Sequence, residues 1–293
     1  MFGAIEAGGT KFVCAVGDEK FQIVDKTSIP TTYPEGTLQK IFNFFDGYRN
    51  LKAMGIGSFG PIGTNKKSET YGYITSTPKK NWRNFNLLGE IKKHYSIPIG
   101  WTTDVNAACL GEYQVGSASA NNSCIYLTVG TGIGGGAILD GKIVEGFGHT
   151  EMGHIIIRNH TDDDFEGVCP YHKNCLEGLA AGPSIEKRYG VKAQNLGADH
   201  RIWRIIAYYL AQALVNYTLI LRPEKIILGG GVMDQPRMID FVREEFSLLL
   251  ANYVETPDLV SYIVTPALGN NAGITGGFIL AHRSLSDINF AKE

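Results

Sequence analysis

Short runs of apolar positions divide the chain into predicted strands and helices that alternate along its length. The first two runs, residues 2–6 and 11–16, have strand length and flank a turn, Ala7-Gly8-Gly9-Thr10. Alternation of strands and helices is typical of the α/β class. Further strands are predicted at 53–58, 97–102, 125–129, 136–139, 225–228 and 261–264, and helices at 38–48, 87–95, from about 104, at 199–221, from 236, and at 271–282.

The opening pattern of strand, glycine turn and strand occurs a second time. Residues 125–129 lead into the glycine-rich turn 130–135, which is followed by a return strand and Asp140-Gly141, as Gly17-Asp18 follows the first pair. The pattern predicts one supersecondary unit used twice, and two unrelated hairpins are the alternative. At 293 residues the chain has the length of two lobes. We place them at 1–117 and 118–293, with the last helix a candidate to pack back on the N-terminal lobe.

Composition narrows the class of function. Apolar residues make up 44% of the chain and charged residues 19%, which is typical of a globular protein. The net charge of −2 offers no basic surface for a nucleic acid or an anionic membrane. The first residues lack a secretory signal, and no run of about 18 apolar residues predicts a membrane span. We therefore expect a cytoplasmic protein, in which the five cysteines serve as metal ligands or buried thiols rather than disulfides.

Three glycine turns each follow an apolar strand. They are Gly8-Gly9-Thr10-Lys11, Gly130-Thr131-Gly132 and Gly229-Gly230-Gly231. Turns without Cβ atoms expose consecutive N–H groups, which bind phosphate oxygens. None has the Gly-Lys-Ser/Thr ending of a P-loop, so a nucleotide would be held between two lobes. Each turn alone also fits an ordinary hairpin or a strand-to-helix loop.

Asp104 is the candidate general base. It follows a predicted strand and precedes a predicted helix. In phosphoryl transfer a carboxylate accepts the proton of the attacking hydroxyl, while magnesium neutralises charge on the phosphates. Position alone favours a simpler reading, in which Asp104 is only the N-cap of the helix.

Two cysteines and two histidines form a second group of candidate residues, His154, Cys169, His172 and Cys175. Two thiolates and two imidazoles complete a tetrahedral set, as structural zinc prefers. We expect zinc to stabilise the loop rather than to take part in catalysis. A disulfide or free surface thiols are the alternatives.

Two carboxylates, Glu151 and Glu177, flank this loop. Carboxylate oxygens suit sugar hydroxyls because each accepts several hydrogen bonds, although a solvated surface charge is the ordinary role of Glu. The sequence His149-Thr150-Glu151 also fits the H-x-E of zinc deaminases, but the Pro-Cys-x-x-Cys that those enzymes need is missing.

In this order and spacing, the motifs of almost the whole chain resemble the ROK family of sugar kinases and repressors, and within it the bacterial fructokinases most closely. The family has the two-lobed actin/hexokinase-like ATPase fold, built from duplicated ribonuclease H-like domains. The matching pieces are Glu6 to Lys11, Gly57-x-x-Gly60-Pro61, Thr103 to Ala108, Thr128 to Gly136, Glu151 to His154, Cys169 to Glu177, and Leu228 to Gly231.

The resemblance implies an ATP-dependent kinase that phosphorylates the 6-hydroxyl of fructose, with Asp104 as the base. Dimers are common in the family, so it also implies a homodimer that binds ATP and a hexose. It further implies these site residues: Gly8, Gly9, Thr10, Lys11, Thr131 and Gly132 at the ATP phosphates, Gly229, Gly230 and Gly231 by the adenosine, Glu6 and Asp104 toward Mg²⁺ through water, Gly60, Pro61, Thr103, Asp104, Glu151, His154 and Glu177 at the sugar, and His154 also on zinc.

Two positions depart from the glucokinases of the family. Glu6 stands where many have Asp, and Thr103 stands where they have Asn before the catalytic Asp, which favours fructose over glucose. Broader hexokinase or mannokinase activity is the alternative within the family. A sugar-responsive repressor would need an N-terminal helix-turn-helix, for which we expect no room before the first strand. An actin-like ATPase without a sugar substrate is disfavoured by Asp104 and the carboxylates Glu151 and Glu177.

Overall fold

The structure, a computed structural model, describes residues 1–290, with side chains through residue 286. Two compact units divide the chain. The first contains Met1–Gly116, Ile143–His149 and the chain from Leu268 onward, and the second contains Ser117–Lys142 and Thr150–Ala267. The first unit is therefore assembled from segments that are far apart in the sequence.

The first unit contains a five-stranded sheet in the order β3-β2-β1-β4-β5. Strands β1 and β2 form an antiparallel hairpin, whereas β1, β4 and β5 run parallel to one another. The strands are β1 (Phe2–Ala7), β2 (Lys11–Gly17), β3 (Ile23–Pro30), β4 (Ala53–Ser58) and β5 (Ile99–Thr103).

The second unit repeats this sheet. Its order is β10-β9-β6-β7-β8, in which β6 and β7 form the antiparallel hairpin and β9 and β10 are the parallel strands. The prediction that one supersecondary unit is used twice is confirmed by this shared order. The strands are β6 (Cys124–Val129), β7 (Ile133–Leu139), β8 (Lys142–Ile143), β9 (Ile226–Gly229) and β10 (Ile263–Val264).

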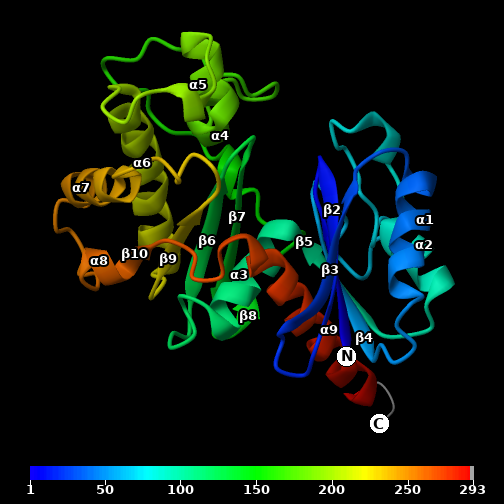
Figure 1. The fold of residues 1–293 in the computed structure, drawn as a ribbon. Helices are drawn as coiled ribbons and strands as arrows, with labels where there is room; N and C mark the ends of the chain where they lie inside the picture. Colours follow the sequence, from blue (N-terminus) through cyan, green and yellow to red (C-terminus); the bar gives the residue numbers. More distant parts are fainter. Residues whose placement is uncertain (291–293) are drawn as a thin grey trace. The chain divides into compact units, whose positions relative to one another are not determined.

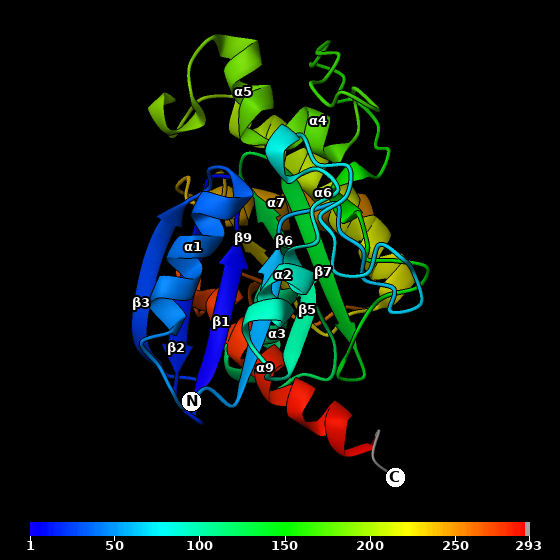
Figure 2. The same cartoon turned by 90° about the vertical axis from the view of Figure 1, so that its right-hand side faces the viewer.

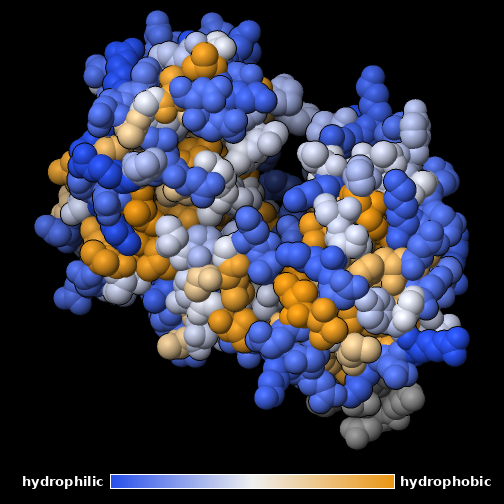
Figure 3. Space-filling model, in the orientation of Figure 1, coloured by the Kyte–Doolittle hydropathy of each residue, from blue (hydrophilic) through white to orange (hydrophobic). Residues whose placement is uncertain are grey.

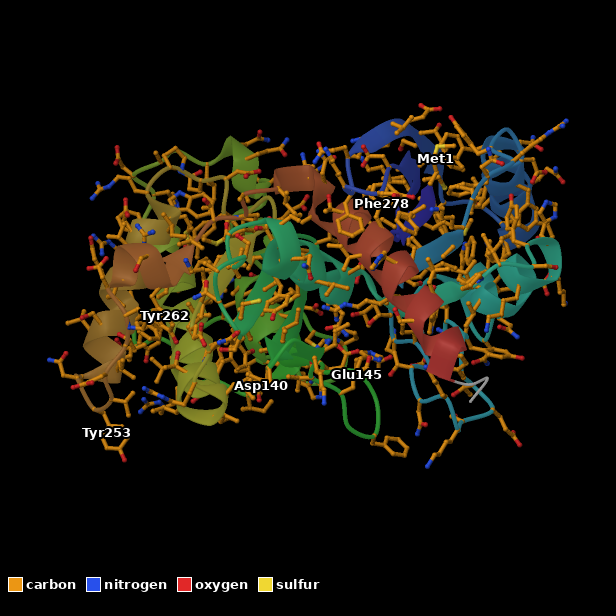
Figure 4. The ribbon with its side chains drawn as sticks, turned by 90° about the horizontal axis from the view of Figure 1, so that it is seen from below. Met1, Asp140, Glu145, Tyr253, Tyr262 and Phe278 are labelled. Carbon is orange, nitrogen blue, oxygen red and sulfur yellow. The ribbon has the colours of Figure 1, made fainter. Side chains whose placement is uncertain are left out.

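Helices cover both faces of the first sheet (Figure 1, Figure 2). On one face, α1 (Pro34–Phe45) and α2 (Leu87–His94) bury an apolar cluster that includes Ile5, Phe12 and Trp82. On the other face, α9 (Ala272–Phe290) packs on β1 and β4, and α3 (Asp104–Val115) packs along α9. Phe278 points from α9 toward the strands (Figure 4).

Glycines let these elements approach at backbone distance. A Cβ atom at Gly55 of β4 would lie 2.0 Å from the carbonyl oxygen of Gly277 in α9. A Cβ at Gly276 would lie 1.7 Å from the carbonyl oxygen of Ala107 in α3, and one at Gly111 would lie 2.4 Å from that of Ala272. No side chain larger than hydrogen fits at these positions, so the sequence fixes the spacing of α3, α9 and β4.

The helices of the second unit surround a buried central helix. The apolar stripe of α6 packs mainly against α7 and α4. Among the described helices, α6 alone is long and apolar enough to cross a membrane, and 61% of that segment is buried inside the protein, as in an ordinary core helix. The helices are α4 (Leu176–Ala180), α5 (Gly182–Tyr189), α6 (Ile202–Leu221), α7 (Met238–Leu250) and α8 (Leu259–Tyr262).

Several predicted boundaries were wrong for local reasons. Helix α1 begins at Pro34 rather than Leu38, because proline is favoured in the first helical turn. Pro236 does not begin α7, because Arg237 adopts a left-handed conformation with φ of 63° and the helix starts after it. The predicted strand 261–264 is half helix, since α8 ends at Tyr262. Strand β7 already begins at Ile133, within the predicted glycine turn.

We expect Gly276→Ala to destabilise the protein by about 3 kcal/mol or more, because the added methyl group overlaps the backbone of α3. Gly36→Ala is the matched control, since Gly36 is an exposed residue of α1 and the atom nearest to its Cβ would be the Oγ1 of Thr32, 3.8 Å away. That change should alter stability by less than about 1 kcal/mol, in the stabilising direction. Denaturant unfolding measures both, and equal stability of the two variants would contradict the packing argument.

Candidate active site

The carboxyl ends of three parallel strands meet at one edge of the first sheet. Ala7 pairs with Ser58, and Ser58 pairs with Thr103, so the three strands end in one row. The residues that follow this row include Gly8 and Asp104. Because ligands of open α/β sheets bind outside the carboxyl ends of the strands, this edge is the first part of the candidate site.

Hydrogen bonds to carbonyl groups of residues 8–11 hold the turn Gly8–Thr10 in place. The N–H of Gly8 donates to the carbonyl of Lys11 at 3.0 Å, and a Cβ at Gly8 would lie 2.6 Å from that oxygen. Thr31 donates its hydroxyl to the carbonyl of Gly8 and its N–H to that of Thr10. These bonds fix the shape of a turn without a side chain at residues 8 and 9, as a phosphate-binding loop requires.

A lysine that we did not predict lies against this turn. The side-chain Cε of Lys79 would be 3.4 Å from a Cβ at Gly9. Lys79 belongs to the long irregular segment 59–86, whose only regular element is a short 3₁₀ helix at Lys80–Trp82. Long loops within compact domains are often functional. The length of this segment was therefore the one feature of the sequence that could have pointed to Lys79.

Asp104 is the first residue of α3 and is half-buried. Its Oδ1 accepts a hydrogen bond from the N–H of Val105 at 2.8 Å. The N-cap is Thr103, whose Oγ1 accepts from the N–H of Asn106 at 3.1 Å, so the reading of Asp104 as an N-cap was wrong. The carboxylate therefore lies in the first turn of α3, at the positive end of the helix dipole.

Glu6 is largely buried at the end of β1. Burial raises the pKa of its carboxyl group, and the positive charges of Lys11 and Lys26 partly oppose that shift. A Cβ atom at Gly273, in the first turn of α9, would lie 2.8 Å from this carboxyl group. Further positive charge at the site would favour its ionised form.

Gly60 and Pro61 follow β4 and are joined by a cis peptide bond. Thr75 donates both its N–H and its hydroxyl to the carbonyl of Pro61. The Nε2 atom of His149 would be 3.7 Å from a Cβ at Gly60, which places an unpredicted imidazole beside this turn. The backbone of His149 also forms an isolated antiparallel bridge with that of Glu145. Burial raises the pKa of the Glu145 carboxyl group, and Figure 4 shows where this residue lies.

Two glycine turns of the second unit lie side by side. Thr128 pairs with Gly229, and Val232 donates its N–H to the carbonyl of Val129. Gly230 has φ of 90°, and a Cβ there would lie 2.5 Å from the nitrogen of Val129. The structure thus brings Gly229–Gly231 beside the start of the turn that contains Thr131 and Gly132.

The four predicted metal ligands converge. One potential ligand atom from each of His154, Cys169, His172 and Cys175 lies within 4.8 Å of all the others. The Nδ1 of His154 is 3.7 Å from the Sγ of Cys169 and 3.5 Å from that of Cys175. Tetrahedral zinc with ordinary bond lengths would separate nitrogen and sulfur ligands by about 3.6 Å, so the donor set fits that ion.

The alternatives for these cysteines are wrong. Cys169 and Cys175 are free and buried, which excludes both a disulfide and surface thiols. Burial and the nearby Cys169 and Glu177 raise the pKa of the Cys175 thiol to about 11, although a backbone N–H from Gly178 opposes the shift. A buried thiol of this kind is suited to a metal ligand, because a cation would favour the thiolate.

Glu177, in the first turn of α4, lies between the ligand group and the turn at Gly132. Its Oε2 accepts from the N–H of Ile133 at 2.9 Å, and its Oε1 is 3.8 Å from the Nε2 of His154. Glu151 precedes the 3₁₀ helix Met152–His154 and is exposed. Both predicted carboxylates thus lie in segments that join the ligand group, and Glu177 contacts the turn.

Known proteins with similar sequences and structures share these motifs' family. The sequence model described as the ROK family matches residues 2–284. A fructokinase from Streptococcus mutans is 50% identical over 94% of this chain and 95% of its own, and one from Pediococcus pentosaceus is 49% identical over 98% and 99%. The crystal structure of a ROK hexokinase from Thermus thermophilus aligns with a TM-score of 0.81 at 24% identity, over 98% of this chain and 99% of that one.

Proposed function

We propose, because this chain belongs to the ROK family and has the two-lobed actin-like ATPase fold, that it is a sugar kinase that transfers the γ-phosphate of ATP to fructose. The observation that carries the proposal is the similarity to bacterial fructokinases, which are 49–50% identical to this chain over nearly its full length. The geometry agrees with it, since a carboxylate, Asp104, and a phosphate-type turn lie at the same edge of one sheet.

Asp104 is the general base in this proposal. Its carboxylate accepts the proton of the attacking hydroxyl and aligns that oxygen on the γ-phosphorus. The bond from Val105 orients one carboxylate oxygen, and an ionised carboxylate can accept several hydrogen bonds. The hydroxyl on carbon 6 is the acceptor, so the products are fructose 6-phosphate and ADP.

The phosphates bind to backbone N–H groups. Gly8, Gly9 and Thr10 form one proposed phosphate turn, with Lys11 next to it, and Thr131 and Gly132 form the other. Gly229, Gly230 and Gly231 flank the adenosine. Mg²⁺ accompanies ATP and supplies charge neutralisation of the phosphates. Glu6 and Asp104 are hard oxygen donors of the kind that Mg²⁺ prefers, and they would hold it through water.

Seven residues are the proposed contacts of the sugar. Gly60, Pro61 and Thr103 are its proposed contacts in the first unit, together with Asp104. Glu151, His154 and Glu177 are its contacts in the second, where carboxylate oxygens accept hydrogen bonds from sugar hydroxyls.

His154, Cys169, His172 and Cys175 would hold a structural zinc ion. Their donor atoms have the separations of a tetrahedral set, and four protein ligands leave no position for a reacting water. Bound zinc would fix the loop that presents His154 and Glu177.

We also infer a cytoplasmic homodimer. Support for the dimer is an apolar surface on the second unit, where Ile220 and Leu248 are 75% and 72% exposed. Figure 3 shows apolar surface over the part of this unit that carries α7 and α8. A monomer in analytical ultracentrifugation would contradict it.

Substituting the base should abolish most turnover. Asp104→Asn keeps the shape of the side chain but loses the proton acceptor, so kcat should fall by about 10²–10⁴-fold while the affinity for fructose is largely kept. Steady-state kinetics and calorimetric titration of fructose measure the two effects. A variant with near-native kcat would contradict the assignment.

Substrate preference tests the proposed function directly. Fructose should have a higher kcat/KM than glucose or mannose at fixed Mg-ATP, in an assay that couples ADP release to a dye, with the phosphate located by NMR. Thr103→Asn should shift the ratio of the two kcat/KM values toward glucose by roughly 5- to 150-fold, because pairing a buried sugar hydroxyl contributes about 1–3 kcal/mol. Asn is an equally good N-cap, so α3 should start as before.

Glucose used as well as fructose by the natural chain would refute the substrate assignment and leave the kinase assignment standing. An unchanged sugar ratio in Thr103→Asn would show that this position does not select the sugar.

Metal analysis tests the zinc loop. Protein purified without added zinc should contain about one equivalent per chain, as expected for a closed four-ligand site. Cys175→Ser should lower the metal content, the melting temperature and the affinity for fructose, because Cys175 directly precedes α4, which contains Glu177. Cys14→Ser is the control, since it makes the same change at a buried cysteine of β2 and should keep the metal. Metal-free natural protein would overturn the zinc assignment.

A further inference from the structure

The two carboxylate oxygens of Glu177 face different parts of the second unit. Oε2 accepts a hydrogen bond from the N–H of Ile133, at the end of the turn that contains Thr131 and Gly132. Oε1 lies 3.8 Å from the Nε2 of His154, with both side chains only about one quarter exposed. One side chain therefore joins the proposed zinc loop to a proposed phosphate turn.

The ring of His154 is oriented for this contact. Its Nδ1 is the atom nearest the sulfurs of Cys169 and Cys175, so Nε2 points away from the ligand group and toward Glu177. A ligating histidine commonly donates its second N–H to a carboxylate, which fixes its tautomer and its ring orientation. Metal bound through Nδ1 would leave the proton on Nε2, and this N–H could donate a hydrogen bond to Glu177.

The phosphate turn closes tightly around the carboxylate. A Cβ atom at Gly132 would lie 2.6 Å from Oε2 of Glu177, whereas one at Gly130 would meet no atom within 4 Å. Gly182, the first residue of α5, donates its N–H to the carbonyl of Gly130 at 2.8 Å. Movement of α4 and Glu177 would thus be transmitted directly to the backbone of this turn.

We propose that Glu177 is a positioning residue that couples the zinc loop to nucleotide binding, by holding the Gly130–Ile133 turn in the shape that binds phosphate. The inference rests on the proposed function, in which this turn binds ATP. It goes beyond contact with the sugar, because it predicts that occupancy of the metal site changes the affinity for nucleotide in the absence of any sugar.

Calorimetric titration with Mg-ADP, without sugar, tests the coupling. In zinc-loaded protein, Glu177→Ala should weaken Mg-ADP binding by about 10-fold or more, the usual effect of losing a hydrogen bond to a charged acceptor. Glu186→Ala is the matched control, since it makes the same change at an exposed glutamate of α5 outside the proposed site and should leave the Mg-ADP affinity unchanged. Equal Mg-ADP affinity in the natural protein and in Glu177→Ala would overturn the proposal.

Removal of zinc with a chelator completes a thermodynamic cycle. Stripping should weaken Mg-ADP binding in the natural protein and have little further effect in Glu177→Ala, because the connecting side chain is then already absent. Equal weakening in both proteins would refute the link to the metal.

Hydrogen exchange supplies a readout that needs no nucleotide. The amide of Ile133 should exchange faster in zinc-loaded Glu177→Ala than in the natural protein, while Glu177→Gln, which keeps an oxygen acceptor, should restore protection. Unchanged exchange in Glu177→Ala would overturn the proposal. A natural protein that phosphorylates fructose but lacks the coupling refutes this inference alone, whereas a folded protein that binds no Mg-ADP refutes the proposed function with it.

Discussion

Close approach of backbones in the first unit is the constraint on which the position of Asp104 depends. Helix α9 can lie on β4 and against α3 only because Gly55, Gly276 and Gly111 carry no side chain at the points of contact. Gly57 continues this pattern, since a Cβ there would lie 2.7 Å from that of Ala107 and 3.3 Å from the Cα of Asp104. The carboxylate proposed as the catalytic base is therefore positioned by the absence of side chains below it as much as by the residues around it.

Each sheet then contributes a turn that follows its first strand. In the first unit the register of β1, β4 and β5 brings the turn at Gly8 and the start of α3 to one edge. In the second unit the pairing of β6 with β9 brings Gly229–Gly231 to the turn after β6. The duplicated topology explains why glycine turns with related proposed roles occur twice in the chain, each time after an apolar strand.

Much of this organisation was readable from the sequence, because strand length, glycine turns and metal-ligand spacing are local patterns. The repeat and the convergence of His154, Cys169, His172 and Cys175 were predicted in this way and are confirmed. Lys79 and His149 were missed because their placement depends on how irregular segments pack, which leaves no period in the sequence. The contact from Glu177 to Ile133 joins residues 44 positions apart and could not be inferred from spacing.

The discontinuous first unit constrains the order in which the protein can fold during synthesis. Helix α9, which completes the packing of β1 and β4, is made after the whole of the second unit. The second unit can therefore finish its core while the first sheet still exposes the apolar face that Phe278 and Ile274 will cover. On the ribosome, the segment made first is thus stabilised last, and its open face is the surface that a chaperone would have to protect in the interval.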